Sequence, residues 1–251
     1  KNPRMLLPNI FTLVGVCIGL TSIKFAFDGR FEMAVIAIIV AGIIDGLDGR
    51  IARLIGGASK VGKELDSLTD VISFGVAPAF IMYFWSLNEI GRVGWLICLV
   101  YVMCVALRLA RFNVSSEGEP SWRDNFFEGI PSPAGGVLVL MPLIYSYSEF
   151  QIINVNYQIV VPILFILISG LLVSKIPTYS FKKIKIKPAM TVFILLGIGV
   201  SLVTLMFFTF ETLLIFSLFY ILSIPLACLT YHNNKKSNQG ENSEDEHEDI
   251  L

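Results

Sequence analysis

Eight long apolar segments, separated by short polar connections, dominate this sequence. They cover residues 7–27, 31–55, 66–87, 93–112, 133–148, 157–174, 189–209 and 212–231. A helix needs about 20 predominantly apolar residues to cross the hydrocarbon core of a bilayer, and the fifth segment alone is clearly short. Because backbone groups in lipid must be satisfied within the segment itself, each is expected to be helical. The sequence therefore predicts an all-α integral membrane protein with about eight transmembrane helices.

The composition supports burial in lipid rather than a large water-soluble core. Of the 251 residues, 55% are hydrophobic and 16% are charged, whereas soluble domains average about 45–50% apolar and about 25% charged residues. Residues 233–251 differ, because they are polar and acidic and contain too few apolar side chains to form a packed core. We therefore expect a transmembrane domain over residues 1–232 and a disordered acidic cytoplasmic tail over residues 233–251.

The basic residues are distributed unevenly between the two ends of the expected helices. If the first residue is cytoplasmic, 16 of the 19 Lys and Arg residues fall at cytoplasmic ends or loops, and only Lys24, Arg30 and Arg92 fall outside. Positive residues are retained on the cytoplasmic side during insertion, so the bias predicts a multi-pass protein of the cytoplasmic membrane with both ends of the chain inside. The basic residues form no aromatic-interleaved patch, so no nucleic-acid partner is expected.

Four aspartates stand near the cytoplasmic ends of the second and third apolar segments. Asp45 and Asp48 are three residues apart, and Asp66 and Asp70 are four apart, so each pair shares a helix face. A short inner connection joins the two segments, which must run antiparallel, so the pairs can face each other. A charged residue at membrane depth costs about 2.5–3.5 kcal/mol on insertion scales. The four carboxylates therefore need a compensating partner.

Divalent cations are one such partner, and basic side chains are another. Carboxylate oxygens are hard ligands that suit Mg²⁺ or Mn²⁺, and two such ions can assist a displacement at phosphorus. Gly46 and Gly49 leave the helix surface bare beside the first aspartate pair, and Arg53 follows by one turn, where it can meet a phosphate. The alternative is a salt-bridge network at the membrane edge with the basic residues Arg50, Arg53, Lys60 and Lys63.

The spacing of these residues resembles the signature of the CDP-alcohol phosphotransferase family. Every fixed position of that signature is present, at Asp45, Asp48, Gly49, Ala52, Arg53, Gly62, Asp66 and Asp70. The stretch Pro8–Thr12 also resembles a first-helix motif of the family that contributes to the nucleotide site. Leu107–Asn113 and Phe127–Ala134 resemble motifs of its phosphatidylserine synthase branch. The resemblance covers roughly residues 5–230 and implies a six-helix core, to which this chain would add two helices.

The resemblance implies a transferase of phospholipid biosynthesis. In such an enzyme the phosphatidyl group of CDP-diacylglycerol, or of an ether-lipid analogue, passes to the hydroxyl of L-serine, which gives the new phospholipid and CMP. The implied cofactors are two divalent cations, Mg²⁺ or Mn²⁺. The implied partners are membrane lipids and a second copy of the chain in a homodimer. The membrane domain would then be the catalytic one, with its active site on the cytoplasmic side.

The resemblance also implies roles for individual residues. Asp45, Asp48, Asp66 and Asp70 would hold the metals, and Asp70 would also act as general base. CDP-diacylglycerol would be bound by Asn9, Thr12, Gly46, Gly49, Arg53, Gly62 and Lys63. A carboxylate favours the planar, bidentate guanidinium of arginine, so the serine site is expected at Arg108, Arg111, Asn113 and Ser132. Anchoring of lipid headgroups is the alternative role for both arginines.

Two alternative functions remain open from the sequence. Other members of the family use the same metal motif with inositol phosphate, glycerol phosphate, choline or ethanolamine as acceptor, so serine rests on the two shorter motifs alone. From a different class, an ion-coupled transporter would also place aspartates within membrane helices, although such sites commonly lie near the bilayer midplane. Release of CMP from CDP-diacylglycerol separates a transferase from a transporter.

Overall fold

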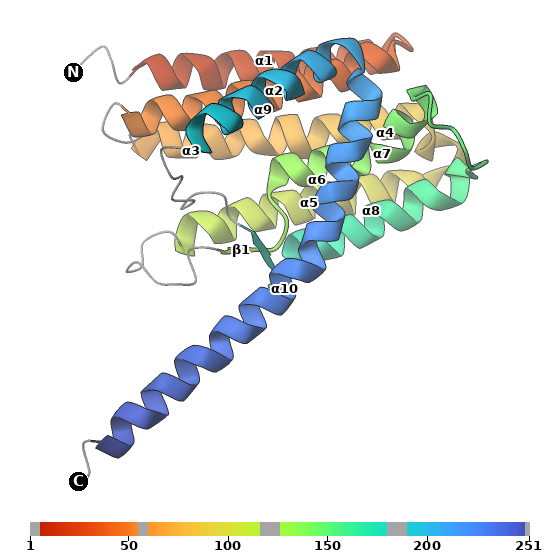
Figure 1. Cartoon of the computed structure of the whole chain (residues 1–251). Helices are drawn as coiled ribbons and strands as arrows, with labels where there is room; N and C mark the ends of the chain where they lie inside the picture. Colours follow the sequence, from red (N-terminus) through yellow and green to blue (C-terminus); the bar gives the residue numbers. More distant parts are fainter. Residues whose placement is uncertain (1–5, 55–59, 116–125, 180–189, 249–251) are drawn as a thin grey trace.

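The chain folds as a bundle of helices with one small sheet (Figure 1). The structure is a computed structural model that describes residues 6–54, 60–115, 126–179 and 190–248. Its elements are α1 (Leu6–Phe27), α2 (Phe31–Leu54), α3 (Lys60–Asp70), η2 (Val71–Val76), α4 (Ala77–Trp85), η3 (Leu87–Ile90), α5 (Arg92–Ser115), β1 (Phe126–Glu128), α6 (Ser132–Val139), α7 (Met141–Tyr147), α8 (Tyr157–Val173), β2 (Pro177–Tyr179), α9 (Thr191–Phe207) and α10 (Thr209–Glu248).

Each of the eight apolar segments forms helix, which confirms the all-α membrane fold. Within the part of the chain that the structure describes, four helical stretches are able, by length and composition, to cross a membrane: Pro8–Phe27, Val61–Trp85, Arg92–Val114 and Thr209–His232. Tyr157–Val173 and Val192–Phe207 are apolar but shorter. The fifth segment is divided into α6 and α7, and Pro142 at the start of α7 accounts for the break, because proline cannot donate the backbone hydrogen bond that would continue the helix.

The first two helices form an antiparallel hairpin that carries the first aspartate pair. Gly29 has a φ of 75°, which glycine adopts without strain, and the Arg30 amide donates to the Phe25 carbonyl at 2.8 Å. Lys24 and Asp28 form an ion pair at this turn. The hairpin therefore returns the chain along α1 and brings the end of α2 beside the start of α1 (Figure 1).

The third membrane helix contains a widened turn directly after Asp70. Residues Val71–Val76 form a π-helix, η2, in which the Ala77 amide donates to the Ile72 carbonyl. Single π-turns inside α-helices are rare and occur frequently at functional sites. The fully buried Tyr101 of α5 donates its hydroxyl to the Phe74 carbonyl at 2.7 Å. This bond ties the widened turn to the neighbouring helix.

Helix α1 approaches the widened turn at a glycine. A Cβ built on Gly19 would lie 2.5 Å from Ser73 Oγ and 3.1 Å from Ser73 Cα. Gly19→Leu is therefore expected to push α1 away from η2 and destabilise the fold by about 1–3 kcal/mol, as overpacking does. The measurement is thermal unfolding in detergent. Gly170→Leu on α8 is the matched control, because nothing lies within 4 Å of its added Cβ; equal melting temperatures for the two variants would refute the close contact.

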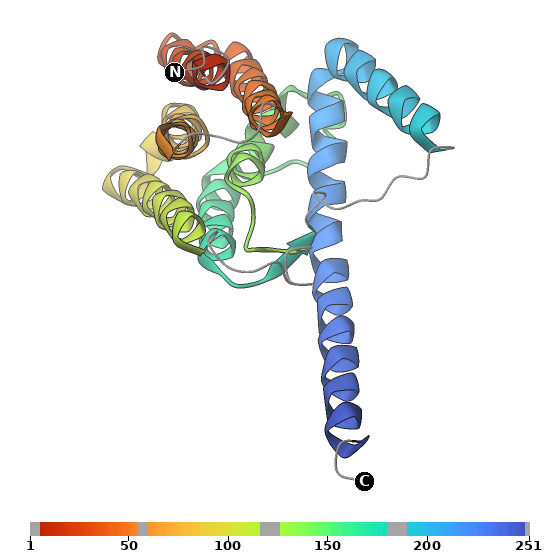
Figure 2. The same cartoon turned by 90° about the vertical axis from the view of Figure 1, so that its left-hand side faces the viewer.

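The two longest loops are joined by the sheet, which the sequence did not predict. Strand β1 pairs antiparallel with β2, with Phe127 opposite Thr178. Strands of three residues carry no alternating pattern long enough to recognise. Helix α10 packs against β2 and α7. Helix α9 overlaps α1 and α2 in Figure 1, but Figure 2 shows it apart from them, and its packing partner is α10.

Helix α10 continues to Glu248 and therefore includes most of the stretch expected to be disordered. The polar stretch continues a helix that is already formed, so it avoids the cost of nucleation and gains one backbone hydrogen bond per added residue. In Figure 1 this part projects away from the bundle. The division into a membrane domain over residues 1–232 and a tail over residues 233–251 stays a prediction.

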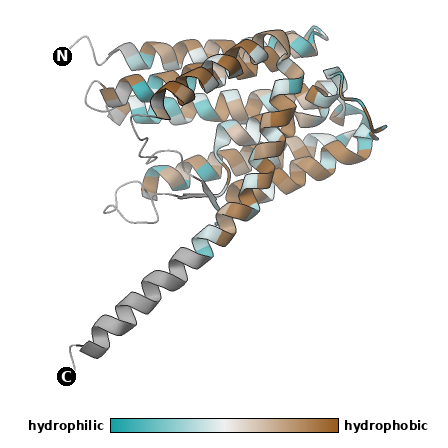
Figure 3. Ribbon diagram, in the orientation of Figure 1, coloured by the Kyte–Doolittle hydropathy of each residue, from teal (hydrophilic) through white to brown (hydrophobic). Residues whose placement is uncertain are grey.

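Hydrophobic residues predominate along most helices of the bundle (Figure 3), and many of the large ones are exposed. The core is formed largely by α2, α4, α5 and α8, with Tyr101 against Phe165 at its centre. On α9, residues 192–200 are all exposed, and all but the glycines have large apolar side chains. A soluble protein rarely exposes such a surface, whereas a lipid environment requires it.

Candidate active site

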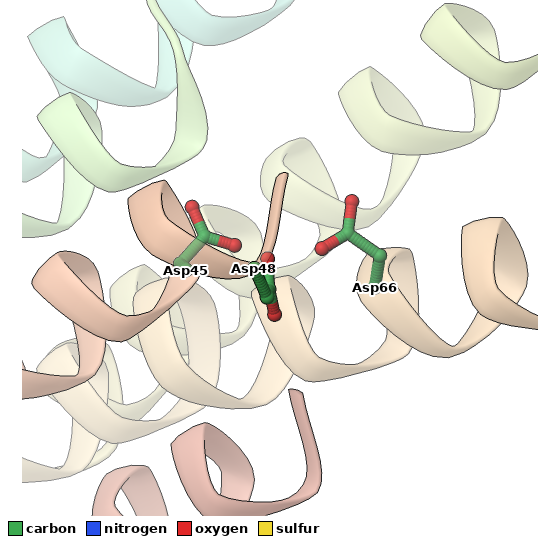
Figure 4. Close-up of side chains that lie close together, drawn as sticks. All are labelled: Asp45, Asp48 and Asp66. Atoms are coloured by element: carbon green, nitrogen blue, oxygen red, sulfur yellow. The ribbon is translucent and has the colours of Figure 1, made fainter. Parts of the chain in front are cut away.

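Three of the four aspartates converge between α2 and α3. Asp45, Asp48 and Asp66 each offer a carboxylate oxygen that lies within 4.8 Å of the others. Figure 4 shows their carboxylates turned toward a common space. Asp48 is held in place because the Thr12 hydroxyl of α1 donates to its Oδ2 at 2.7 Å. The expected facing of the two helices is thus present, and α1 contributes to it.

Asp70 extends this cluster into the protein. Its carboxyl group and that of Asp45 are close enough to be hydrogen-bond partners. Its Oδ1 is buried and has no hydrogen-bond partner among the described residues. Two carboxyl groups at this distance repel unless they share a proton or a cation, and a buried oxygen without a partner carries a free-energy cost. The four aspartates therefore form one acidic centre.

The acidic centre fits divalent cations. Its donors are all carboxylate oxygens, which suit hard cations such as Mg²⁺, Mn²⁺ and Ca²⁺. Their spacing within 4.8 Å lets one ion contact several of them. The space beside Gly46 and Gly49 is open, because nothing lies within 4 Å of a Cβ built on either glycine. The cluster is thus able to bind metal while one side stays accessible to a substrate.

A cavity of about 490 Å³ opens beside the acidic centre. Its wall includes Asp45, Asp66 and Asp70 together with Gly46 and Gly49. The remaining lining residues come from α3, α5 and the start of α6, and they are Lys63, Ser67, Arg108, Leu109, Phe112, Asn113, Pro131, Ser132 and Pro133. The signature residues and the two shorter motifs, far apart in sequence, therefore face one space.

Arg108 is the buried cation of this cavity. Its side chain is only 7% exposed, and its Nη1 donates to the Ser132 hydroxyl at 2.9 Å. Its Nε is buried without a hydrogen-bond partner among the described residues. It also lies close enough to Asp70 to interact electrostatically. A guanidinium with an unused donor beside an open space is suited to bind an anionic group.

Lys63, Ser67 and Asn113, which also line the cavity, form a linked set. The side-chain amide of Asn113 donates to Ser67 Oγ at 2.9 Å, and the Ser67 hydroxyl donates to the backbone carbonyl of Lys63 at 3.2 Å. Lys63 Nζ in turn donates to the backbone carbonyl of Asn113 at 3.3 Å. Ser67 was not expected from the sequence. Its position four residues after Lys63 could have indicated it, because residues four apart share a helix face.

Some expected binding residues lie elsewhere. Among the described residues, Asn9, Thr12, Gly62 and Arg111 do not line the cavity. Thr12 instead supports Asp48, and Gly62 is buried within α3. Arg111 donates its Nη2 to the Val173 carbonyl at the end of α8, at 2.6 Å. The side chain of Arg53 lies outside the described residues.

The chain is similar to known membrane-lipid transferases. Residues 5–168 match the family described as CDP-alcohol phosphatidyltransferase. Two relatives are named CDP-diacylglycerol–serine O-phosphatidyltransferase: that of Helicobacter pylori is 40% identical over 202 residues, and that of Mycobacterium leprae is 46% identical over 137 residues. A relative from Methanothermobacter thermautotrophicus, named archaetidylserine synthase, is 33% identical over 172 residues.

The extent of these matches differs. The match to the Helicobacter pylori protein covers 80% of this chain and 83% of that protein. The match to the Mycobacterium leprae protein covers 54% of this chain and only 45% of that protein. For the archaetidylserine synthase the match covers 68% of each. The family match includes all four aspartates and Arg108 but ends before β2, α9 and α10.

Proposed function

Because this chain belongs to the CDP-alcohol phosphatidyltransferase family, we propose that it transfers the phosphatidyl group of CDP-diacylglycerol to the hydroxyl of L-serine. The products are phosphatidylserine and CMP. The names of the Helicobacter and Mycobacterium relatives support serine as the acceptor. The observation that carries the proposal is the cavity that joins the acidic centre to the buried guanidinium of Arg108.

The proposed cofactors are two divalent cations, Mg²⁺ or Mn²⁺, held by Asp45, Asp48, Asp66 and Asp70. Bound there, they would withdraw charge from the diphosphate and favour the departure of CMP. Gly46 and Gly49 admit the diphosphate to the backbone of α2, because the space beside them is open. Lys63, which lines the cavity, supplies a positive charge to the same group.

Asp70 is the proposed general base for the serine hydroxyl. The serine oxygen forms a bond to the phosphorus that carries diacylglycerol, and the bond from that phosphorus to the bridging oxygen breaks. CMP leaves with the electron pair, and the serine proton passes to Asp70. Its Oδ1 has no hydrogen-bond partner among the described residues and is therefore free to accept that proton. Holding both reactants in one cavity supplies the proximity that such a weak base needs.

Arg108 is the proposed partner of the serine carboxylate, with Ser132 and Asn113 as polar neighbours. Arg108→Lys keeps the positive charge but removes the planar fork. A hydrogen bond to a charged group is worth about 1.5–3 kcal/mol, so the apparent serine constant should rise about tenfold to a hundredfold. The measurement is a serine titration at saturating CDP-diacylglycerol.

Arg92→Lys is the control for this variant, because Arg92 is exposed at the other end of the same helix. Its serine constant should stay at the native value. Arg111→Lys separates the two arginines of the sequence prediction: with Arg111 bonded to Val173, its serine constant should change less. An unchanged constant in Arg108→Lys would contradict the proposed carboxylate site.

The acceptor is tested directly with a panel of alcohols. Purified protein is incubated with radiolabelled CDP-diacylglycerol, Mg²⁺ or Mn²⁺, and either serine, inositol phosphate, glycerol phosphate or ethanolamine. CMP release that depends on serine supports the proposal. Release only with another acceptor would keep the transferase chemistry and reject serine, whereas no release with any acceptor would favour the transporter alternative. An ether-linked donor in a parallel series tests the ether-lipid substrate.

We also propose that the protein lies in the cytoplasmic membrane with both ends of the chain and the cavity on the cytoplasmic side. The excess of basic residues in the connections at that end supports this orientation. In Figure 1 the start of α1, the start of α3 and strand β1 lie toward the same end of the bundle. A homodimer within surrounding lipid remains part of the proposal, and crosslinking in native membranes would test it.

A further inference from the structure

Ser67 is a polar residue of the cavity wall to which the proposed reaction assigns no role. It follows the proposed metal ligand Asp66 on α3 and lines the cavity. The side-chain amide of Asn113, near the end of α5, donates to Ser67 Oγ at 2.9 Å. Helix α3 packs mainly against α1, and α5 packs mainly against α8. The hydrogen bond therefore joins two helices that line the same cavity but pack mainly against different partners.

The directions of the hydrogen bonds at Ser67 determine how the Asn113 amide is turned. The Ser67 hydroxyl donates its proton to the backbone carbonyl of Lys63 at 3.2 Å. A hydroxyl has a single proton, so toward Asn113 the Ser67 oxygen acts as an acceptor, and the amide turns its NH₂ group toward Ser67. The terminal torsion of an asparagine side chain is broad and roughly two-fold. The Ser67 oxygen therefore selects one of the two orientations of the amide.

The backbone of Asn113 is held by a separate bond. Asn113 lies in the last turn of α5, which ends at Ser115, and the last four carbonyls of a helix have no partner within that helix. Lys63 Nζ donates to the Asn113 carbonyl at 3.3 Å, and the helix dipole also favours a cation at this end. Lys63 thus holds the end of the helix in place, whereas Ser67 orients the side chain.

We propose that Ser67 is a positioning residue for the acceptor: it holds the side-chain amide of Asn113 in the orientation that binds the amino-acid end of serine. This inference rests on the proposed function, in which Arg108 and Asn113 lie beside the bound serine. Both line the cavity, and Asn113 follows Arg108 by five positions on α5, which corresponds to about 7.5 Å along the helix axis. One serine between two hydrogen bonds of about 2.9 Å spans a distance of this order. Ser67 acts on serine through Asn113 and need not contact either substrate.

The test begins with Ser67→Ala, which removes the hydroxyl. The apparent constant for serine should rise about threefold to tenfold, the effect of losing one neutral hydrogen bond, while the turnover number and the constant for CDP-diacylglycerol stay native. Ser67→Thr keeps the hydroxyl and should restore a serine constant close to the native one. Ser201→Ala is the matched control, because Ser201 donates in the same way to the carbonyl four residues before it, at 2.8 Å, on α9 and away from the cavity.

A double-mutant cycle then tests whether Ser67 acts through Asn113. Asn113→Ala should itself raise the serine constant, and adding Ser67→Ala to it should change that constant no further. An equal rise from Ser67→Ala in both backgrounds overturns the inference, and so does a native serine constant in Ser67→Ala.

The same measurements exclude a merely structural role. A parallel fall of turnover, CDP-diacylglycerol affinity and melting temperature in Ser67→Ala would also overturn the inference, because a loosened helix affects both substrates together. The native protein is assayed beside the variants. If it releases no CMP with serine, the proposed function fails and the inference falls with it, whereas failure of the positioning role alone leaves the native activity intact.

Discussion

Asp66→Asn is expected to reduce CMP release by about a thousandfold or more. Its carboxylate lies within 4.8 Å of those of Asp45 and Asp48, and a metal pair supplies several kcal/mol of charge stabilisation in the transition state. Since each 1.36 kcal/mol is a factor of ten in rate, loss of one ligand should remove most of the turnover. Asp48→Asn should reduce CMP release to a similar extent. Thr12 donates to only one oxygen of the Asp48 carboxylate, which leaves the other oxygen to bind metal.

Glu64→Gln provides the matched control for Asp66→Asn. Glu64 lies on the same helix two residues away, but it is exposed and does not belong to the acidic centre. Its turnover should equal that of the native protein. The decisive measurement is CMP release across a titration of Mg²⁺ and of Mn²⁺. Substantial turnover of Asp66→Asn at saturating metal would reject the two-metal assignment.

Asp70→Asn is expected to separate chemistry from binding. The amide keeps the size of the side chain but cannot take the serine proton, and loss of a general base costs about a hundredfold to ten-thousandfold in rate. CDP-diacylglycerol affinity should change far less, because three aspartates of the centre remain. Turnover and lipid-nucleotide affinity are measured on the same preparation. An equal collapse of both would show that Asp70 acts chiefly as a metal ligand.

The acidic centre was predictable because its residues follow local rules. Two aspartates three or four residues apart share a helix face, and a short connection makes the two helices antiparallel. Those two facts bring Asp45 and Asp48 opposite Asp66 without knowledge of the rest of the fold. The open space beside Gly46 and Gly49 follows in the same way, because glycine has no side chain to fill it.

The remainder of the cavity was less predictable because it depends on contacts between distant segments. The sequence gives no reason to prefer Arg108 over Arg111 as the ligand of serine. In the fold, Arg111 is bound by the Val173 carbonyl at the end of α8. Ser132 accepts a hydrogen bond from Arg108 because the short connection between β1 and α6 places the start of α6 beside α5. These positions follow from packing, which no short pattern encodes.

The widened turn η2 sets the rotational phase of the third membrane helix. An α-helix turns about 100° per residue, and a π-turn accommodates about one extra residue. Side chains after η2 are therefore displaced around the axis relative to those before it. Asp66 and Asp70 precede it and face the cavity, whereas Ile81 and Met82 follow it and are fully buried. The part of the helix before η2 thus directs its aspartates to the cavity, and the part after η2 directs its apolar side chains to the core. Because η2 offsets the two parts around the helix axis, the position of the metal-binding aspartates does not constrain the packing of the apolar part.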